Sequence, residues 1–225
     1  MGPQHSVPGH QLPHPLLLLD NSLPKDKFKQ LCKQKVLEYW HEKLSRDAAL
    51  PFLEYLQPSS LSLSHPHPIF TSLDGNPYQA QASRIQALFL TGRYRSERLC
   101  RFWSANKNGV CLLEPCRSQE LFEDIHHIIL RCSGLTAVRR RLLTFTREYA
   151  ADKPVLKEIV ETYLCSDNDD LRMQFIIDCS VLPLVISSYQ LHGPIIHQQL
   201  FNITRTWCRS LHVARMKALG HFNKL

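Results

Sequence analysis

Apolar residues recur at helical spacing along much of this chain of 225 residues. Residues 25–44 carry them on one stripe, as an amphipathic helix does. From the same spacing, or from bounding turn residues, further helices are predicted over residues 77–90, 99–103, 121–131, 136–151, 155–164 and 194–219. The alternation typical of strands is weak throughout, so the pattern predicts a mainly α fold.

Several of these helices have recognisable ends. Asn76 can cap a helix and Pro77 fits its first turn. Gly92 suits the left-handed turn that follows the last residue of the same helix. Pro194 opens the last long helix and Gly220 ends it.

Two segments lack helical patterning. Residues 1–24 are predicted to be a disordered, flexible tail, because residues 1–19 mix Pro, His, Gln and Leu without periodicity. Residues 57–68 are rich in Ser, His and Pro, which is typical of an irregular connector. The remaining chain divides into a helical region at 25–104, a cysteine-rich segment at 105–135 and a C-terminal helical region at 136–225.

Composition limits the class of the protein. The 27 lysines and arginines exceed the 20 acidic residues, a formal charge of +7 that is compatible with nucleic acid. No run of about eighteen apolar residues occurs, and Asp178 and Pro183 interrupt the most apolar window, so we expect no membrane helix. No secretion signal is visible. We therefore expect an intracellular protein whose 8 cysteines are thiols or metal ligands rather than disulfides.

Three cysteines and a histidine form the most informative pattern. Four residues separate Cys111 from Cys116, ten more precede His127, and another four separate His127 from Cys132. Zinc takes four such ligands at tetrahedral positions. A tight loop with two cysteines can supply one half, and a histidine and a cysteine five residues apart can supply the other. We predict a small zinc knuckle embedded in the helical domain, with a closed shell and a structural role.

Spacing alone leaves alternatives to this ligand set open. His126 could replace His127, and the cysteines could instead be buried free thiols, which are common in protein cores. Glu123 and Asp124 offer oxygen atoms, which structural zinc sites use less often. The other five cysteines are predicted to be ordinary buried thiols: Cys32, Cys100, Cys165, Cys179 and Cys208. Among them, Cys100 is a less favoured candidate ligand.

Several segments, in order along the chain, resemble those of one family. Residues 36–44, residues 76–94 with their Leu-Thr-Gly-Arg-Tyr ending, and residues 111–132 resemble the region downstream of the polymerase in LINE-type (non-LTR) retrotransposon reverse transcriptase polyproteins. Residues 174–180 and 200–208 resemble the terminal helices of that region. The resemblance runs from about Lys25 to the end of the chain, and it adds support for zinc at the knuckle.

The resemblance implies RNA and/or DNA as the partner, the rest of such a polyprotein as a further partner, and a location in the nucleus and/or the cytoplasm. It also identifies residues 25–104 as a post-polymerase, thumb-like or connector region. The family's polymerase uses paired aspartates in an apolar hairpin, whereas Asp169 and Asp170 stand in a polar run. No endonuclease pattern follows the knuckle. We therefore expect no catalytic activity and no small-molecule substrate.

Basic residues supply candidate contacts to nucleic acid. No acidic residue lies between Arg131 and Arg147, and none follows Asp178. Arginines on helices beside the knuckle could bind phosphates. The predicted contacts are Arg131, Arg139, Arg140, Arg141, Arg147, Arg205 and Arg209. The alternative is a structural or protein-interaction helical domain with no nucleic-acid role.

The last long helix is predicted to be amphipathic. Arg205, Arg209 and His212 share one face at helical spacing and are predicted to point outward. Arg215 is predicted to lie toward one edge of this face. The predicted inward stripe consists of Leu200, Ile203, Trp207 and Leu211.

Overall fold

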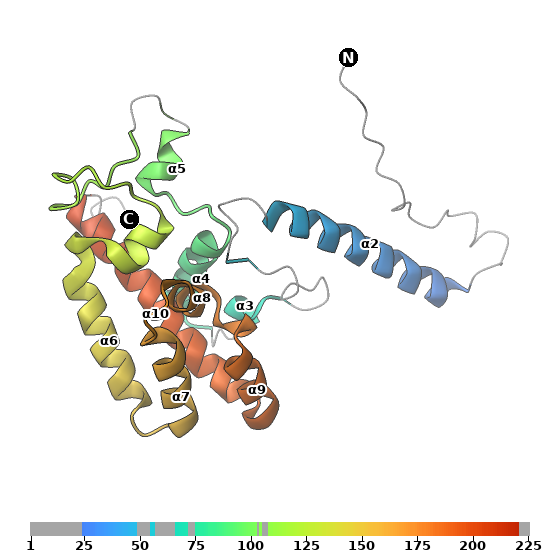
Figure 1. Ribbon diagram of the computed structural model, residues 1–225. Helices are drawn as coiled ribbons and strands as arrows, with labels where there is room; N and C mark the ends of the chain where they lie inside the picture. Colours follow the sequence, from blue (N-terminus) through green and yellow to red (C-terminus); the bar gives the residue numbers. More distant parts are fainter. Residues whose placement is uncertain are drawn as a thin grey trace, which may run out of the picture. The chain divides into compact units, whose positions relative to one another are not determined.

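The computed structural model describes residues 24–48, 55–56, 66–71, 75–102, 104 and 108–220 (Figure 1). It contains two compact units, Met1–His65 and Pro66–Leu225. Nearly all of the predicted flexible tail, and most of the predicted connector at 57–68, lie outside the described residues.

The first unit contains helix α2 (Lys25–Ala48), which begins where the pattern predicts and extends past the predicted end. Its apolar stripe is only partly covered. Phe28 and Val36 are half-buried, whereas Leu31 and Trp40 are exposed. None of the described side chains of α2 is fully buried.

The second unit is built from helices, and the pattern did not predict those at 68–71, 169–178 and 183–192. They are α3 (Pro68–Thr71), α4 (Pro77–Leu90), α5 (Glu97–Arg101), η2 (His127–Arg131), η3 (Ser133–Leu135), α6 (Thr136–Ala150), α7 (Pro154–Ile159), η4 (Val160–Leu164), α8 (Asp169–Asp178), η5 (Cys179–Val181), α9 (Pro183–His192) and α10 (Pro194–Ala218). Among the described residues there is no strand, and Val110 and Phe122 form an isolated antiparallel bridge. The fold is mainly α.

Helix α10 is the central element of this unit, and α4, α6, α8 and α9 all contact it (Figure 1). Its predicted inward stripe is buried, with Leu200 and Leu211 fully inaccessible and Trp207 4% exposed. The indole N–H of Trp207 donates to Thr146 Oγ1 of α6 at 3.0 Å. Trp207 is therefore a core residue whose one polar group is satisfied.

The ends of α4 follow the predicted local chemistry. The Asn76 side chain accepts a hydrogen bond from the Tyr78 N–H at 2.9 Å, and Pro77 is the first helical residue. Gly92 has φ 62°, a conformation that a residue with a side chain rarely adopts. The turn brings Tyr94 back to stack on Phe89, with ring centroids 4.0 Å apart. The Leu-Thr-Gly-Arg-Tyr segment is thus a helix end that buries Tyr94.

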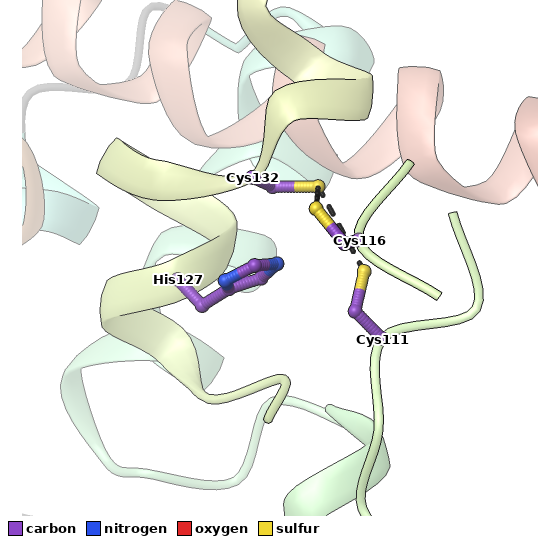
Figure 2. Close-up of side chains that lie close together, drawn as sticks. All are labelled: Cys111, Cys116, His127 and Cys132. Atoms are coloured by element: carbon purple, nitrogen blue, oxygen red, sulfur yellow. Dashed lines mark hydrogen bonds between the residues drawn. The ribbon is translucent and has the colours of Figure 1, made fainter. Parts of the chain in front are cut away.

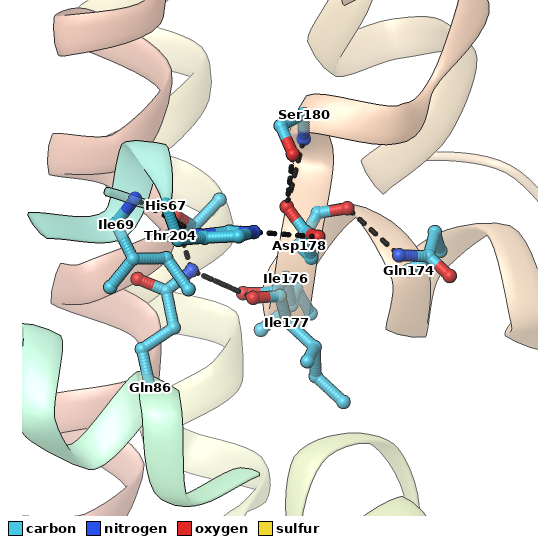
Figure 3. Close-up of polar contacts among 9 residues, drawn as sticks. All are labelled: His67, Ile69, Gln86, Gln174, Ile176, Ile177, Asp178, Ser180 and Thr204. Atoms are coloured by element: carbon cyan, nitrogen blue, oxygen red, sulfur yellow. Dashed lines mark hydrogen bonds and ion pairs between the residues drawn. The ribbon is translucent and has the colours of Figure 1, made fainter. Parts of the chain in front are cut away.

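The junction between α8 and α9 is polar and buried (Figure 3). The Asp178 carboxylate accepts hydrogen bonds from the N–H and O–H of Ser180, at 3.1 and 2.6 Å. His67 Nε2 lies 3.2 Å from the other oxygen of Asp178. Asp178 is fully buried, so these partners replace the water that its carboxylate loses.

Gln86 of α4 satisfies the end of α8 from the other side (Figure 3). Its amide nitrogen lies 3.3 Å from the Ile176 carbonyl oxygen, 2.9 Å from that of Ile177, and 3.0 Å from Thr204 Oγ1. Carbonyls at a helix end lack partners within the helix. Gln86 therefore ties α8 and α10 to α4 through one buried amide.

The stretch Asp169–His192 is long and apolar enough, by length and composition, to cross a membrane. Here it comprises α8, η5 and α9, with a break at Leu182 and Pro183. Half of its most apolar window is buried within the structure, as is common for core helices.

Candidate metal centre

A short hairpin carries Cys111 and Cys116. The Cys111 N–H donates to the Leu121 carbonyl at 2.8 Å, and the Glu123 N–H donates to the Gly109 carbonyl at 2.9 Å. The Leu121 N–H also donates to the Cys116 carbonyl at 3.2 Å. These bonds close a loop between Cys111 and Leu121. Residues 121–124 thus belong to the hairpin and its exit, and the predicted helix start at residue 121 is wrong.

His127 and Cys132 lie on the π-helical turn η2 and directly after it. The Asp124 side chain accepts a hydrogen bond from the His127 N–H at 2.7 Å and so caps this turn. The Cys132 N–H donates to the His127 carbonyl at 2.6 Å. In an α-helix, residues five apart point about 140° away from each other. The π turn, whose hydrogen bonds join residues five apart, brings these two side chains to the same side.

The four predicted ligands converge (Figure 2). Their ligand atoms all lie within 4.8 Å of one another. Cys132 Sγ is 3.8 Å from both Cys111 Sγ and Cys116 Sγ. Four zinc ligands with zinc–sulfur bonds of about 2.3 Å place tetrahedral sulfurs about 3.8 Å apart. Both distances from Cys132 match this separation.

The histidine also fits a metal ligand. All four residues are buried, and His127 Nε2 is buried without a hydrogen-bond partner among the described residues. An unpaired buried nitrogen is costly, because it has lost its water and gained nothing in return. A metal bond at this nitrogen would remove that cost. The group is therefore one that could hold a metal ion.

The sulfurs interact strongly with one another. A hydrogen bond with Cys132, together with burial, raises the pKa of the Cys111 thiol well above its usual value. The same bond lowers the pKa of Cys132, against the effect of burial. Cys132 therefore loses its proton more readily than Cys111 does. Metal ions deprotonate coordinating thiols outright. A bound cation would therefore replace the hydrogen bond in which Cys111 and Cys132 share one proton.

The alternative ligands lie elsewhere. His126 does not belong to the group, and its Nε2 lies 3.9 Å from Asp169 Oδ2. Cys100 is half-buried on α5 and does not belong to the group. Asp124 caps η2 instead of facing the sulfurs. His127 is therefore the histidine that joins the three cysteines.

Glu123 and Arg215 anchor the hairpin to α10. Glu123 is fully buried, and its carboxylate accepts two hydrogen bonds from Arg215, at 2.5 and 3.1 Å. The Glu97 N–H donates to the same carboxylate at 2.8 Å. The expectation that Arg215 lies toward the edge of an outward face is wrong, because the hairpin covers that side of α10 and supplies its counter-charge. Neither residue was assigned this role from sequence, since they lie 92 positions apart.

Arg205 also corrects the predicted outward face of α10. It is 2% exposed. Its Nε donates to the Phe201 carbonyl at 2.9 Å, and its Nη2 donates to Asn202 Oδ1 at 2.8 Å. This side of α10 packs against α4, and oxygen acceptors around the guanidinium compensate its lost hydration. Arg209 is half-buried, with its guanidinium over the Tyr78 ring at 5.5 Å.

The predicted arginines near the knuckle differ in their surroundings. Arg140 and Arg141 are exposed on α6 and have no hydrogen bond or ion pair with the described residues. Arg147 is exposed beside Cys165, and Arg131 pairs with an acidic side chain, Asp169, at 3.2 Å. Arg139 is half-buried and donates to the Cys132 carbonyl at 2.6 Å, so it belongs to the surroundings of the metal centre.

The other predicted free thiols fall into two groups. Cys179 and Cys208 are buried, as expected. Cys32, Cys100 and Cys165 are half-buried.

Comparison of the chain with protein-family models, curated proteins and solved structures gives no match. A proposal about function therefore rests on the site itself.

Proposed function

We propose that Cys111, Cys116, His127 and Cys132 bind one structural zinc ion, and that the knuckle so formed orients α6 on the phosphates of RNA or DNA. The convergence of the four ligand atoms within 4.8 Å carries the first part of this proposal. Three thiolates and an imidazole complete a tetrahedral shell and leave no open position for a substrate. The ion would hold the hairpin against the start of α6.

The exposed arginines of α6 support the second part. Arg140 and Arg141 have no partner among the described residues, so their charge is available to a polyanion. Arg147 lies two turns after Arg140 on the same side of the helix. Guanidinium groups on one surface bind phosphates without reading sequence. Burial removes Arg205 from this surface.

The family resemblance extends the proposal. The chain would be the C-terminal region of a LINE-type reverse transcriptase polyprotein, acting in the nucleus or the cytoplasm beside the catalytic part. Asp169 and Asp170 sit at the start of α8, where the Asp169 carboxylate pairs with Arg131 and Arg172. That pairing supports a structural role and agrees with a non-catalytic region. Extension of a primed template by the purified chain would contradict it.

A structural or protein-interaction domain is the second candidate. Arg205 and Arg215 are buried, which leaves fewer arginines on the surface than the sequence suggests. Such a domain would keep its zinc but would bind nucleic acid only weakly. Substitution of the α6 arginines would not change that binding.

Zinc content tests the first part of the proposal. Protein purified without added metal should contain one equivalent of zinc, as measured by elemental mass spectrometry. Cys116→Ser and His127→Ala should each lose it, since each removes a ligand. The matched controls Cys100→Ser and His126→Ala should retain it. Unchanged zinc in Cys116→Ser would refute the proposed ligands.

A salt series of RNA and DNA binding tests the second part. Affinity should fall steeply as salt rises, because bound phosphates release counterions. The double variant Arg140→Gln/Arg141→Gln should bind more weakly and show a shallower salt dependence. Lys157→Gln, an exposed charge on α7, is the matched control. Binding that does not change with salt would favour the second candidate.

A further inference from the structure

A hollow of about 440 Å³ lies between α5 and the hairpin that carries Cys111 and Cys116. Its lining consists of Arg98, Arg101, Phe102, Phe122 and Asp124. This volume falls within the range of small-ligand sites. None of these residues was assigned a role from the sequence, apart from the alternative considered for Asp124.

Two exposed aromatic rings set this hollow apart. Phe102 is 62% exposed and Phe122 is 56% exposed. Exposing apolar rings to water is unfavourable, and adjacent exposed apolar groups often mark a binding surface. Both rings here line one depression with charged residues around it.

The backbone fixes these side chains in place. Phe122 is held in the bridge with Val110, within the hairpin that carries Cys111 and Cys116. The Arg98 N–H donates to the Glu123 carbonyl at 3.0 Å, which joins α5 to the hairpin. A ligand in this hollow would meet a preformed surface, and a metal ion in the neighbouring group would stiffen it further.

The charges of the lining favour an anionic ligand. Arg98 pairs with Asp124 at 3.2 Å, which leaves that pair neutral. Arg101 is exposed and forms no hydrogen bond or ion pair with the described residues. The hollow therefore combines apolar rings with one uncompensated positive charge.

We propose that this hollow binds an unstacked base of single-stranded RNA or DNA, with Phe102 and Phe122 as stacking surfaces and Arg101 on an adjacent phosphate. Aromatic side chains stack on the faces of bases, and those faces are hidden in a duplex. The inference rests on the proposed nucleic-acid function and adds a preference for single strands to it.

Fluorescence of a single-stranded oligonucleotide with one 2-aminopurine tests the site. Wild type should bind it more tightly than the matching duplex and should change its emission on stacking. Phe122→Ala and Phe102→Ala should each weaken binding about tenfold and reduce the emission change. Phe122→Trp should preserve both. Phe70→Ala, which removes a 48% exposed ring on α3, is the matched control and should bind like wild type.

Arg101→Gln tests the phosphate contact separately. It should reduce the slope of log affinity against log salt by about 0.7, the value for one phosphate of a single strand. Zinc content of every variant should equal that of wild type, which shows that the hairpin is intact.

The outcomes separate the two proposals. If Phe102→Ala and Phe122→Ala both bind the single strand with wild-type affinity, the base site is overturned. Nucleic-acid binding by α6 would then still stand. Equal affinity for single strand and duplex would also overturn the base site. No binding by wild type to any nucleic acid would overturn both.

Discussion

Arg215 of α10 and Glu123 of the hairpin form a buried, two-pronged ion pair. The Nη2–Oε1 distance is 2.5 Å and the Nε–Oε2 distance is 3.1 Å, and the two side chains are 5% and 1% exposed. Burial opposes the charge on Arg215, but hydrogen bonding and attraction to Glu123 raise its pKa. The pair thus fastens the candidate metal centre to the central helix.

Glu123→Gln should destabilise the protein strongly. The substitution removes the carboxylate that accepts both hydrogen bonds and leaves the buried Arg215 only the more distant Glu97 carboxylate, 3.8 Å away, as a negative partner. Such changes cost about 3–5 kcal/mol in the free energy of unfolding, which urea denaturation would measure. Arg131→Gln breaks an exposed pair with Asp169 and should change stability by less than about 1 kcal/mol. Equal effects of the two substitutions would contradict an anchoring role for Glu123.

Local patterns were sufficient to predict most helices and all four members of the candidate metal group. Asn76 caps the start of α4 with its side chain and Gly92 supplies the positive φ after its end, so no distant contact was needed. The spacing of Cys111, Cys116 and Cys132 is likewise a local property. The choice between His126 and His127 was less secure, because it depends on a π turn that spacing alone does not reveal.

Burial of charged residues could not be predicted in the same way. Arg205 and Arg215 fit an outward basic face by helical periodicity, yet both are buried. Whether an arginine is buried depends on acceptors that the fold brings to it. For Arg215 that acceptor is Glu123, in a hairpin whose position follows from tertiary packing.

Gly134 allows the two halves of the metal group to approach. A Cβ atom there would lie 2.9 Å from Leu113 Cβ and 3.0 Å from the Glu114 carbonyl oxygen. Gly134→Ala should therefore push the Cys111–Cys116 loop away from η3, cost about 1–3 kcal/mol of stability, and speed zinc loss to a chelator. The matched control is Gly193→Ala, which strains a positive φ in open space. It should lower stability and leave the rate of zinc loss unchanged.

Arg139 should stabilise the metal-bound form. Its Nη2 donates to the Cys132 carbonyl, and its Nη1 is buried without a hydrogen-bond partner among the described residues. Burial lowers the pKa of Arg139, while the sulfurs of Cys132 and Cys116 favour its charge. Three thiolates and one imidazole give a zinc complex a net charge of −1, which a nearby guanidinium offsets.

Arg139→Gln should therefore weaken zinc binding about tenfold, as measured by competition with a chromogenic chelator. Arg140→Gln, one position further along α6 and exposed, is the control and should retain wild-type affinity. Equal zinc affinity in Arg139→Gln and wild type would show that its contact with Cys132 does not support the metal.

His212 of α10 should make stability depend on pH. Its Nδ1 lies 2.9 Å from the Tyr94 hydroxyl, which can donate to it while the imidazole is neutral. Burial, and then the charges of Arg215 and Arg209, lower the pKa of His212 below its usual value. The folded protein therefore resists protonation that the unfolded chain accepts at about pH 6.5.

The stabilisation from neutral His212 should be fully present above about pH 6.5 and should decline as pH falls toward the lower pKa of the folded state. His212→Gln keeps an acceptor for Tyr94 but cannot be protonated. Urea denaturation at pH 7.5 and 5.5, with zinc present, should thus show a smaller loss of stability in the variant than in wild type. Protonation of the metal ligands affects both proteins and cancels in the difference. An identical pH dependence in the two proteins would show that His212 is not held neutral by its buried setting.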